Sequence, residues 1–205
     1  MRNPIPFPLF VILSFLSITV QAQDPEEKSF TIRLQRPTGW YATPEGYWTT
    51  EFYKTAMMSR EMRKKYKEAS KQPDNTTLLY SFIKYDGQDR YNPSISVQSR
   101  KEEWQTLLGL RVEMSGIATN IKKLFREVQT IDEIQETTVG GYPAVYYSVR
   151  YLNQLFGSTT ALRRSRYYLV LVGDYVINFD LRDNETDENC TDIYRYFMES
   201  VQLSL

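Results

Sequence analysis

The side chains that could carry chemistry in this chain are carboxylates, arginines, tyrosines and a single cysteine, because the sequence contains no histidine. Histidine is the commonest general base and the commonest metal ligand. Its absence excludes Ser-His-Asp and Cys-His hydrolysis and the zinc sites that contain histidine. No Walker loop, nucleophile elbow or dinucleotide-binding glycine pattern is present. The sequence therefore predicts no catalytic residue, no cofactor and no metal.

Carboxylates provide the enzymatic alternative. A hydrolase without histidine would use two acids across a cleft, and Asp180, Asp183 and Glu136 are the candidates for such a pair. No spacing in the sequence places two of them opposite each other. The alternating acids of residues 183–187 hint at a calcium loop, but Glu188 stands where the EF-hand template requires glycine. We interpret these acids as helix-capping and solubilising residues.

Charge is segregated along the chain although the formal net charge is zero. Residues 54–71 hold seven basic and two acidic side chains, whereas residues 180–192 hold six acids and one arginine. Near neutrality argues against nucleic acid as the partner. The two segments are either docking patches for a protein or an anionic surface, or ordinary solvated faces, or patches that pair with each other. The candidate partner-binding residues are Arg60, Arg63, Lys64 and Lys67.

Three further features have both a structural and a functional interpretation. Cys190 has no partner for an internal disulfide, and its acidic surroundings disfavour the thiolate, so we expect an inert residue at a helix start. Tyr147 and Tyr151 are expected in the core, whereas Tyr146 faces the opposite way beside Arg150 and could belong to a carbohydrate- or peptide-binding face. A cluster of arginines could bind an anion: Arg163, Arg164 and Arg166.

The first 22 residues have the pattern of an export signal. Arg2 precedes an apolar run over residues 7–20, and Val20-Gln21-Ala22 supplies small residues at the −3 and −1 positions of a cleavage site. The run is too short for a permanent transmembrane anchor. We expect a signal peptide over residues 1–22, a flexible lead over 23–29 and a single domain over 30–205. The protein is predicted to be exported, periplasmic or secreted, after cleavage near Ala22.

Alternating apolar and polar residues predict the strands. They are expected over residues 30–35, 47–48, 78–85, 95–97, 131–138, 144–151, 166–172 and 176–181. Pro37-Thr38-Gly39-Trp40 predicts a turn that brings a large aromatic side chain back onto the fold, and Gly140-Gly141 and Gly173-Asp174 predict tight turns between strands.

Helical spacing predicts three helices. The first covers residues 54–71, with Met58, Met62 and Tyr66 on its buried face. The second covers 101–126, with an apolar stripe that Trp104, Leu107 and Leu108 open. The third begins near residue 187 with Thr186 as N-cap, and its expected buried residues are Ile193, Tyr194, Phe197, Met198 and Val201. Strands that alternate with helices and end in tight turns predict an α+β fold with a central antiparallel β-sheet and helices packed on both faces.

Three segments resemble the PsbP-like superfamily, which includes small exported bacterial proteins related to DcrB. They are Pro37-Thr38-Gly39-Trp40, Gly140-Gly141-Tyr142-Pro143-Ala144, and the hairpin over 167–171 and 175–179 that precedes a terminal amphipathic helix. The resemblance covers nearly the whole mature chain and rests on fold-level motifs. It implies an α/β/α sandwich and an accessory, assembly or binding role, and it supplies no catalytic motif. We therefore expect an exported, non-catalytic accessory or binding protein.

Overall fold

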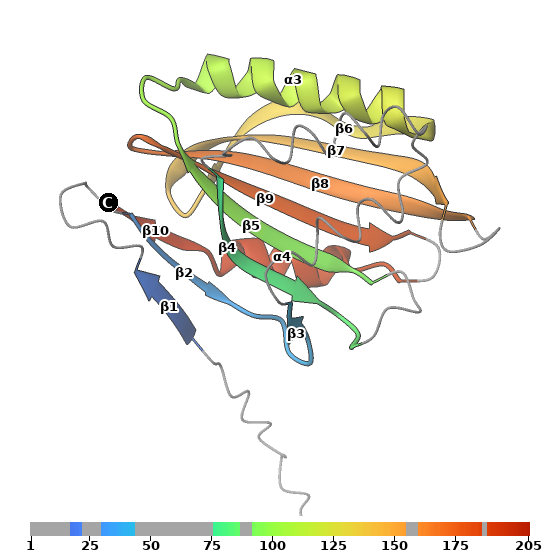
Figure 1. Ribbon diagram of the computed structural model, residues 1–205, viewed down its shortest axis with the longest axis horizontal. Coiled ribbons are helices and arrows are strands. Elements are labelled where there is room, and N and C mark those ends of the chain that lie inside the picture. Colours follow the sequence, from blue (N-terminus) through green and yellow to red (C-terminus); the bar gives the residue numbers. More distant parts are fainter. Residues whose placement is uncertain (1–16, 22–29, 44–75, 87–91, 155–159, 186–187) are drawn as a thin grey trace, which may run out of the picture.

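The computed structural model of this 205-residue chain describes residues 17–21, 30–43, 76–86, 92–154, 160–185 and 188–205. They form a seven-stranded antiparallel sheet, a small three-stranded sheet and two helices (Figure 1). The large sheet has the spatial order β3 (Tyr41–Ala42), β4 (Thr76–Ile83), β5 (Ser94–Lys101), β9 (Tyr175–Asn184), β8 (Thr160–Val172), β7 (Tyr142–Gln154) and β6 (Arg126–Val139). The small sheet has the order β1 (Ser17–Gln21), β2 (Thr31–Gln35) and β10 (Gln202–Ser204), and the helices are α3 (Leu107–Leu124) and α4 (Thr191–Glu199). The predicted α+β class with a central antiparallel sheet is confirmed.

The core follows from the period-two alternation of the long strands. In β7, Val145, Tyr147, Val149 and Tyr151 are buried in one cluster with Leu110 and Met114 of α3. The neighbouring position, Ala144, belongs to a second cluster, to which α4 contributes Tyr194 and Phe197. Strand β8 sends Leu169 to the first cluster and Val170 to the second. The predicted core positions of Tyr147 and Tyr151 are therefore confirmed.

The first predicted strand and its turn are also confirmed. Phe30, Ile32 and Leu34 are buried, while the residues between them are less buried or exposed. Gly39 has a φ of +78°, and the Trp40 amide donates to the Pro37 carbonyl at 3.2 Å. This turn buries Trp40, whose ring meets that of Tyr194 edge-on with centroids 6.0 Å apart.

The β6–β7 turn requires glycine for two reasons. Gly140 and Gly141 have φ values of +56° and +87°, which L side chains rarely adopt. A Cβ at Gly140 would also lie 3.1 Å from the Leu203 amide nitrogen and 3.2 Å from the Val201 carbonyl oxygen. The turn therefore presses directly on the chain that leads into β10.

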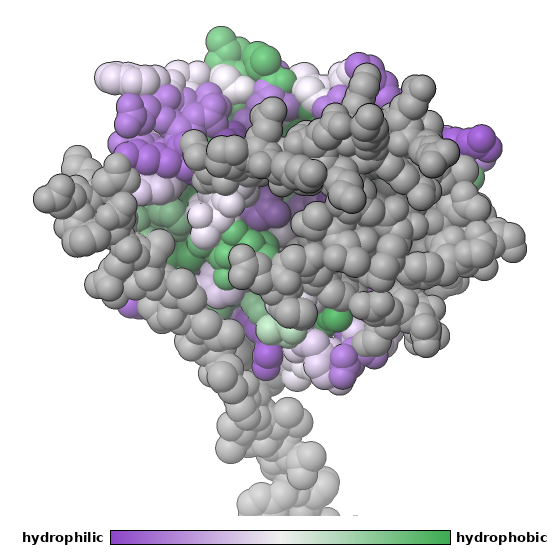
Figure 2. Space-filling model, viewed as in Figure 1, coloured by the Kyte–Doolittle hydropathy of each residue, from purple (hydrophilic) through white to green (hydrophobic). Residues whose placement is uncertain are grey.

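Helix α3 begins later than predicted, and the start of its apolar stripe differs. The Thr106 side chain accepts a hydrogen bond from the Gly109 amide and caps the helix. Trp104 lies before this cap with a φ of +67° and is 92% exposed, and Leu108 is 71% exposed, so the prediction that both open the buried stripe is wrong. Leu107, the third residue predicted to open the stripe, does pack against the core, and the first fully buried residue of the stripe is Leu110. Figure 2 shows the exposed hydrophobic side chains over the N-terminal part of α3, at the top of the view.

Helix α4 also begins later than predicted. Its first residue is Thr191 and its N-cap position is Cys190, so the prediction of a start near residue 187 is wrong. The Asp183 carboxylate accepts a hydrogen bond from the Cys190 amide at 2.8 Å, and Asn184 bridges to Glu188. These bonds fix Glu188 and Cys190 to the end of β9, so the helix begins only after them. The sequence had indicated an earlier start because acidic side chains favour a helix N-terminus.

Strand β6 extends five residues before the predicted start at Ile131. Most of its side chains are exposed, and its register with β7 shifts three times. Every second side chain from Val128 to Ile134 is half-buried, but two of these four are the polar Thr130 and Asp132, so the sequence shows little apolar alternation there. The irregular register of this edge strand discourages pairing with other chains.

Several predicted elements lie outside the described residues. They are the helix over 54–71, the strand at 47–48, the lead over 23–29 and most of the signal peptide. Residues 17–21 of the predicted signal peptide form β1, which pairs with β2. No helix among the described residues is long and apolar enough to cross a membrane.

Candidate functional site

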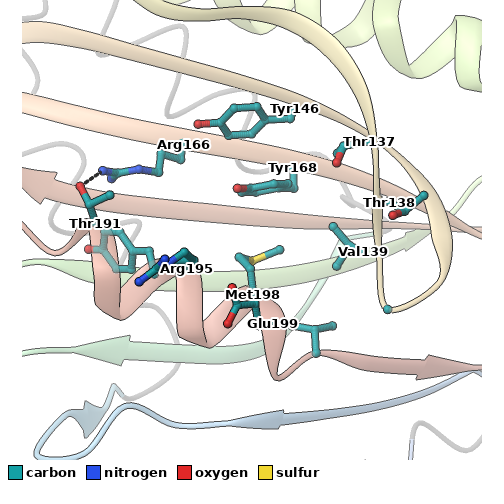
Figure 3. A pocket seen from close by; sticks show the side chains of 13 residues that line it. Thr137, Thr138, Val139, Tyr146, Arg166, Tyr168, Thr191, Arg195, Met198 and Glu199 are labelled. Carbon is teal, nitrogen blue, oxygen red and sulfur yellow. Dashed lines mark hydrogen bonds between the residues drawn. The ribbon is translucent and has the colours of Figure 1, made fainter.

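A groove of about 480 Å³ lies between α4 and the large sheet (Figure 3). One side is α4, the base is formed by β7 and β8, and the far end is the β6–β7 turn with Thr137, Thr138 and Gly140. We call it the α4 groove. Its volume is within the range of sites for small molecules.

Two tyrosines form an aromatic step at the base of the α4 groove. Tyr146 of β7 and Tyr168 of β8 are register partners, and their ring centroids are 4.6 Å apart. The Tyr146 hydroxyl donates to Asp132 of β6 at 2.9 Å, and burial raises the pKa of this tyrosine. Burial also raises the pKa of Tyr168, although the charge of Arg166 opposes the increase. Both hydroxyls are therefore protonated at neutral pH.

Two arginines share one buried carboxylate at one end of the groove. Arg164 donates to both oxygens of Asp183, at 3.3 and 3.2 Å, and Arg166 donates to Oδ1 at 3.3 Å. The Asp183 side chain is fully buried, and the Arg164 and Arg166 side chains are 12% and 8% exposed. Both guanidinium groups also donate to the Thr191 hydroxyl at 2.8 Å. A second, favourable contact places the Arg166 guanidinium over the Tyr194 ring, 5.2 Å from its centroid.

The alternation of β8 divides the predicted arginine cluster between two faces. Arg164 and Arg166 bond to Thr191 of α4, whereas Arg163 lines a smaller cavity of about 250 Å³ beneath α3. The prediction that the three arginines form one cluster is therefore wrong, and only Arg166 lines the α4 groove.

The described acids of residues 180–192 are paired with basic side chains rather than gathered as an open patch. Asp180 accepts two hydrogen bonds from Arg182, Glu188 pairs with Lys84, and Glu185 lies 3.5 Å from Arg150. On α4, Asp192 pairs with Arg195 at 3.1 Å. The interpretation of this segment as an acidic docking patch is not supported by these ion pairs.

The candidate carboxylate pair does not converge on one cleft. Asp183 is buried with its two arginines beside α4, whereas Asp180 pairs with Arg182, which lines the cavity beneath α3. Glu136 is exposed on β6 and pairs with Arg111 at 3.1 Å. The hydrolase alternative therefore loses the acids on which it depended.

Cys190 occupies the position predicted for it, at the start of α4, and its side chain is buried. Burial raises the pKa of its thiol to about 11, although the nearby charge of Lys84 opposes the increase. The thiolate is thus a minor form at neutral pH, which agrees with the expected inert residue.

The groove includes side chains that the sequence analysis did not single out. Tyr168 was recognised only as part of an apolar hairpin, and Thr137 and Arg195 had no distinguishing pattern, nor had Asp132, which holds the Tyr146 hydroxyl. They come together because β6, β7 and β8 are register neighbours and α4 returns across them. Arg60, Arg63, Lys64 and Lys67, the predicted partner-binding residues, lie outside the described residues.

Two solved structures are similar to this chain over most of its length. LpqN, which is involved in cell envelope biogenesis of Mycobacterium tuberculosis, has a TM-score of 0.54 and 14% sequence identity, over 94% of this chain and 92% of LpqN. Cyanobacterial PsbP from Synechocystis has a TM-score of 0.47 and 12% identity, over 92% of this chain and 94% of that chain. No protein-family model and no curated protein matches the sequence. The predicted resemblance to PsbP-like proteins is confirmed as a likeness of fold, and the comparison extends to the fold alone.

Proposed function

We propose that this protein is an exported, non-catalytic binding protein that holds a small ligand in the α4 groove. The observation that supports this most directly is the groove itself, about 480 Å³ in volume and lined by a tyrosine pair, threonines and arginines. A concave site with a mostly aromatic and apolar base and a few converging polar groups is the usual form of a ligand site. Export is proposed from the signal-peptide pattern of residues 1–22.

A binding role is favoured over catalysis by what the charged groups do. Asp183 and both its arginines hold one another, and the Tyr146 hydroxyl is engaged by Asp132. The pKa of each groove tyrosine is raised, so neither tyrosine is a base at neutral pH. These groups can orient and hold a ligand, and none of them is poised to transfer a proton.

A variant that fills the groove tests the proposal. Thr137 is exposed at the groove wall, so Thr137→Trp should occupy the groove with little cost to folding. The full chain would be incubated with an envelope extract, repurified and denatured, and the released small molecules would be identified by mass spectrometry. We expect wild type to retain a compound that Thr137→Trp loses. Thr119→Trp, at an exposed position on α3, is the matched control and should retain it. Equal retention by all three proteins, or by none, would contradict the proposal.

We also propose that the basic segment 54–71 docks an acidic partner or an anionic surface through Arg60, Arg63, Lys64 and Lys67. Its support is the concentration of seven basic side chains in 18 residues of sequence. Substitution of Arg63, Lys64 and Lys67 by Glu should weaken binding of the acidic partner, and added salt should weaken binding of wild type in the same way. The melting temperature should change little, because exposed charges contribute little to stability. Pull-down at low salt together with thermal melting checks this. Unchanged recovery of the partner would show that the segment is only a solvated face.

A further inference from the structure

We infer that the ligand of the α4 groove is an organic anion, a carboxylate or phosphate on an aromatic or apolar body, whose charged group lies at the Arg166 end. This inference deepens the proposed function and rests on it. The charge balance at that end of the groove is its first support. Two buried guanidinium groups share the single carboxylate of Asp183, and their other hydrogen bonds go to the neutral oxygens of Thr191 and Asn189. The Arg164–Arg166–Asp183 cluster therefore carries a net charge of +1, which attracts an incoming anion, while the carboxylates of Asp132, bonded to the Tyr146 hydroxyl, and of Glu199 lie outside this cluster.

Open hydrogen-bond donors are the second support. Among the described residues, none accepts a bond from the Arg166 Nε–H or from the Tyr168 hydroxyl. Both residues line the groove, and in Figure 3 the hydroxyls of Tyr146 and Tyr168 point toward the end where Arg166 lies. Arg195 approaches the same end from α4, and it pairs with the exposed Asp192. Arginine N–H groups and tyrosine hydroxyls that are open toward the same end of a groove can hold a carboxylate or phosphate.

The other residues that line the groove form the surface on which the aromatic or apolar body of the ligand would pack. The Tyr146–Tyr168 step offers ring faces, and Met198 and Val139 add apolar surface beside it. An aromatic or flat apolar group packs well on such a surface. Glu199, which lies four residues beyond Arg195 on α4, repels an anion from its part of the groove. The charged group is therefore placed beside Arg166, and the body extends toward Met198 and the β6–β7 turn.

The test uses the full chain with defined probes and NMR detection. Phenyl phosphate and benzoate carry the two anionic groups on a ring, benzyl alcohol carries the ring without charge, and inorganic phosphate carries charge without the ring. Spectra of the ¹⁵N-labelled protein would follow the backbone amides and the arginine Nε–H groups. We expect both aromatic anions to shift the groove residues and the Arg166 Nε–H, and to bind more tightly than the other two probes.

Two groove variants and one control make the test specific. Tyr168→Phe removes a hydroxyl that has no partner among the described residues and keeps the ring, so it should fold as wild type and bind the anions about tenfold more weakly or worse. Arg166→Gln leaves Arg164 with Asp183 as a neutral pair and should abolish the preference for anions over benzyl alcohol. Tyr196→Phe, at an exposed position on α4, is the matched control and should bind as wild type.

Each unfavourable outcome has a distinct meaning. Equal binding of benzyl alcohol and benzoate in the groove would overturn the inference and leave the groove as a ligand site. Equal binding of inorganic phosphate and phenyl phosphate would overturn the aromatic or apolar body. If neither aromatic anion shifts the NMR resonances of the groove residues, the inference is overturned. The proposed function is then still decided separately, by the retention assay with Thr137→Trp.

Discussion

At the scale of single residues, Asp183 is a fully buried carboxylate whose charge is balanced by two arginines. Its side chain is fully buried, accepts from Arg164, Arg166 and the Cys190 amide, and therefore links β8 and β9 to the start of α4. Asp183→Asn should lower the free energy of unfolding by about 3–5 kcal/mol, because it leaves two guanidinium groups buried without a carboxylate. Urea unfolding measures this. The control, Asp192→Asn, breaks an exposed pair and should change stability by less than about 1 kcal/mol. A small effect at Asp183 would mean that solvent or a bound anion already compensates the arginines.

Cys190 gives the molecule a pH dependence of known sign. Burial raises the pKa of its thiol from an ordinary value of 9.0, which applies to an unfolded chain, to about 11. The folded state therefore holds more protons between these values, and the free energy of unfolding falls as pH rises from about 9 to 11. In Cys190→Ala this contribution is missing. The stability advantage of wild type over the variant should shrink across that range by up to about 3 kcal/mol, measured by urea unfolding at each pH. Parallel pH curves for the two proteins would show that the thiol does not ionise differently in the two states.

At the scale of elements, two glycines should respond oppositely to the same change. Gly116 lies inside α3 and a Cβ there would meet no atom within 4 Å, so Gly116→Ala should stabilise the protein by about 0.5–1 kcal/mol through helix propensity. Gly140 has a φ of +56° and would place its Cβ against the backbone that leads into β10, so Gly140→Ala should destabilise by more than about 1 kcal/mol. Thermal unfolding of both variants checks the signs. A neutral Gly140→Ala would indicate that the β6–β7 turn and β10 move apart easily.

The elements also show which parts of the fold the sequence could predict. Strand β7 was predicted because one face is buried throughout, so that its apolar residues recur at every second position. The start of α3 was misplaced because the prediction overlooked Thr106, which caps the helix by accepting a hydrogen bond from the Gly109 amide. The start of α4 was misplaced because it depends on a hydrogen bond from the Cys190 amide to Asp183, seven residues earlier on β9, which has no local signature. The groove was missed for the same reason, because Tyr168 and Arg195 become neighbours only when α4 returns across the sheet.

At the scale of the whole molecule, the charge pattern has a different meaning from the one that the sequence suggested. The acids of residues 180–192 were expected to face a partner or solvent, or to pair with the basic segment 54–71. Instead Asp183 and Asp180 neutralise arginines of β8 and β9 within the fold. Within the described part of the chain, the cluster of Arg164, Arg166 and Asp183 beside the α4 groove carries a net charge of +1, and the proposed ligand site relies on it. Local charge counts could not reveal it, because it arises from two arginines on β8 and one acid on β9.

The last prediction concerns residues 17–21, which the sequence assigns to a cleaved signal peptide and the structure uses as β1. This strand lies at the edge of the small sheet and pairs with β2, whose other side pairs with β10. A chain that begins at Gln23 should keep the seven-stranded sheet and both helices, because β1 is not a member of that sheet. In a central antiparallel strand successive amides point alternately to its two neighbours. Without β1, hydrogen exchange should therefore become fast at every second amide of β2 and stay slow at those that face β10.

The full chain is the control for this experiment, since both sets of β2 amides are then protected. Loss of protection along the whole of β2, or unfolding of the domain, would show that β1 is an integral strand and would argue against cleavage after Ala22. Protection of all β2 amides in the shortened chain would mean that the exposed edge takes up another strand, from the same chain or a second copy, as unpaired edges readily do. Alternating exchange would leave β2 as an open edge in the chain that begins at Gln23, paired on one side only, with β10.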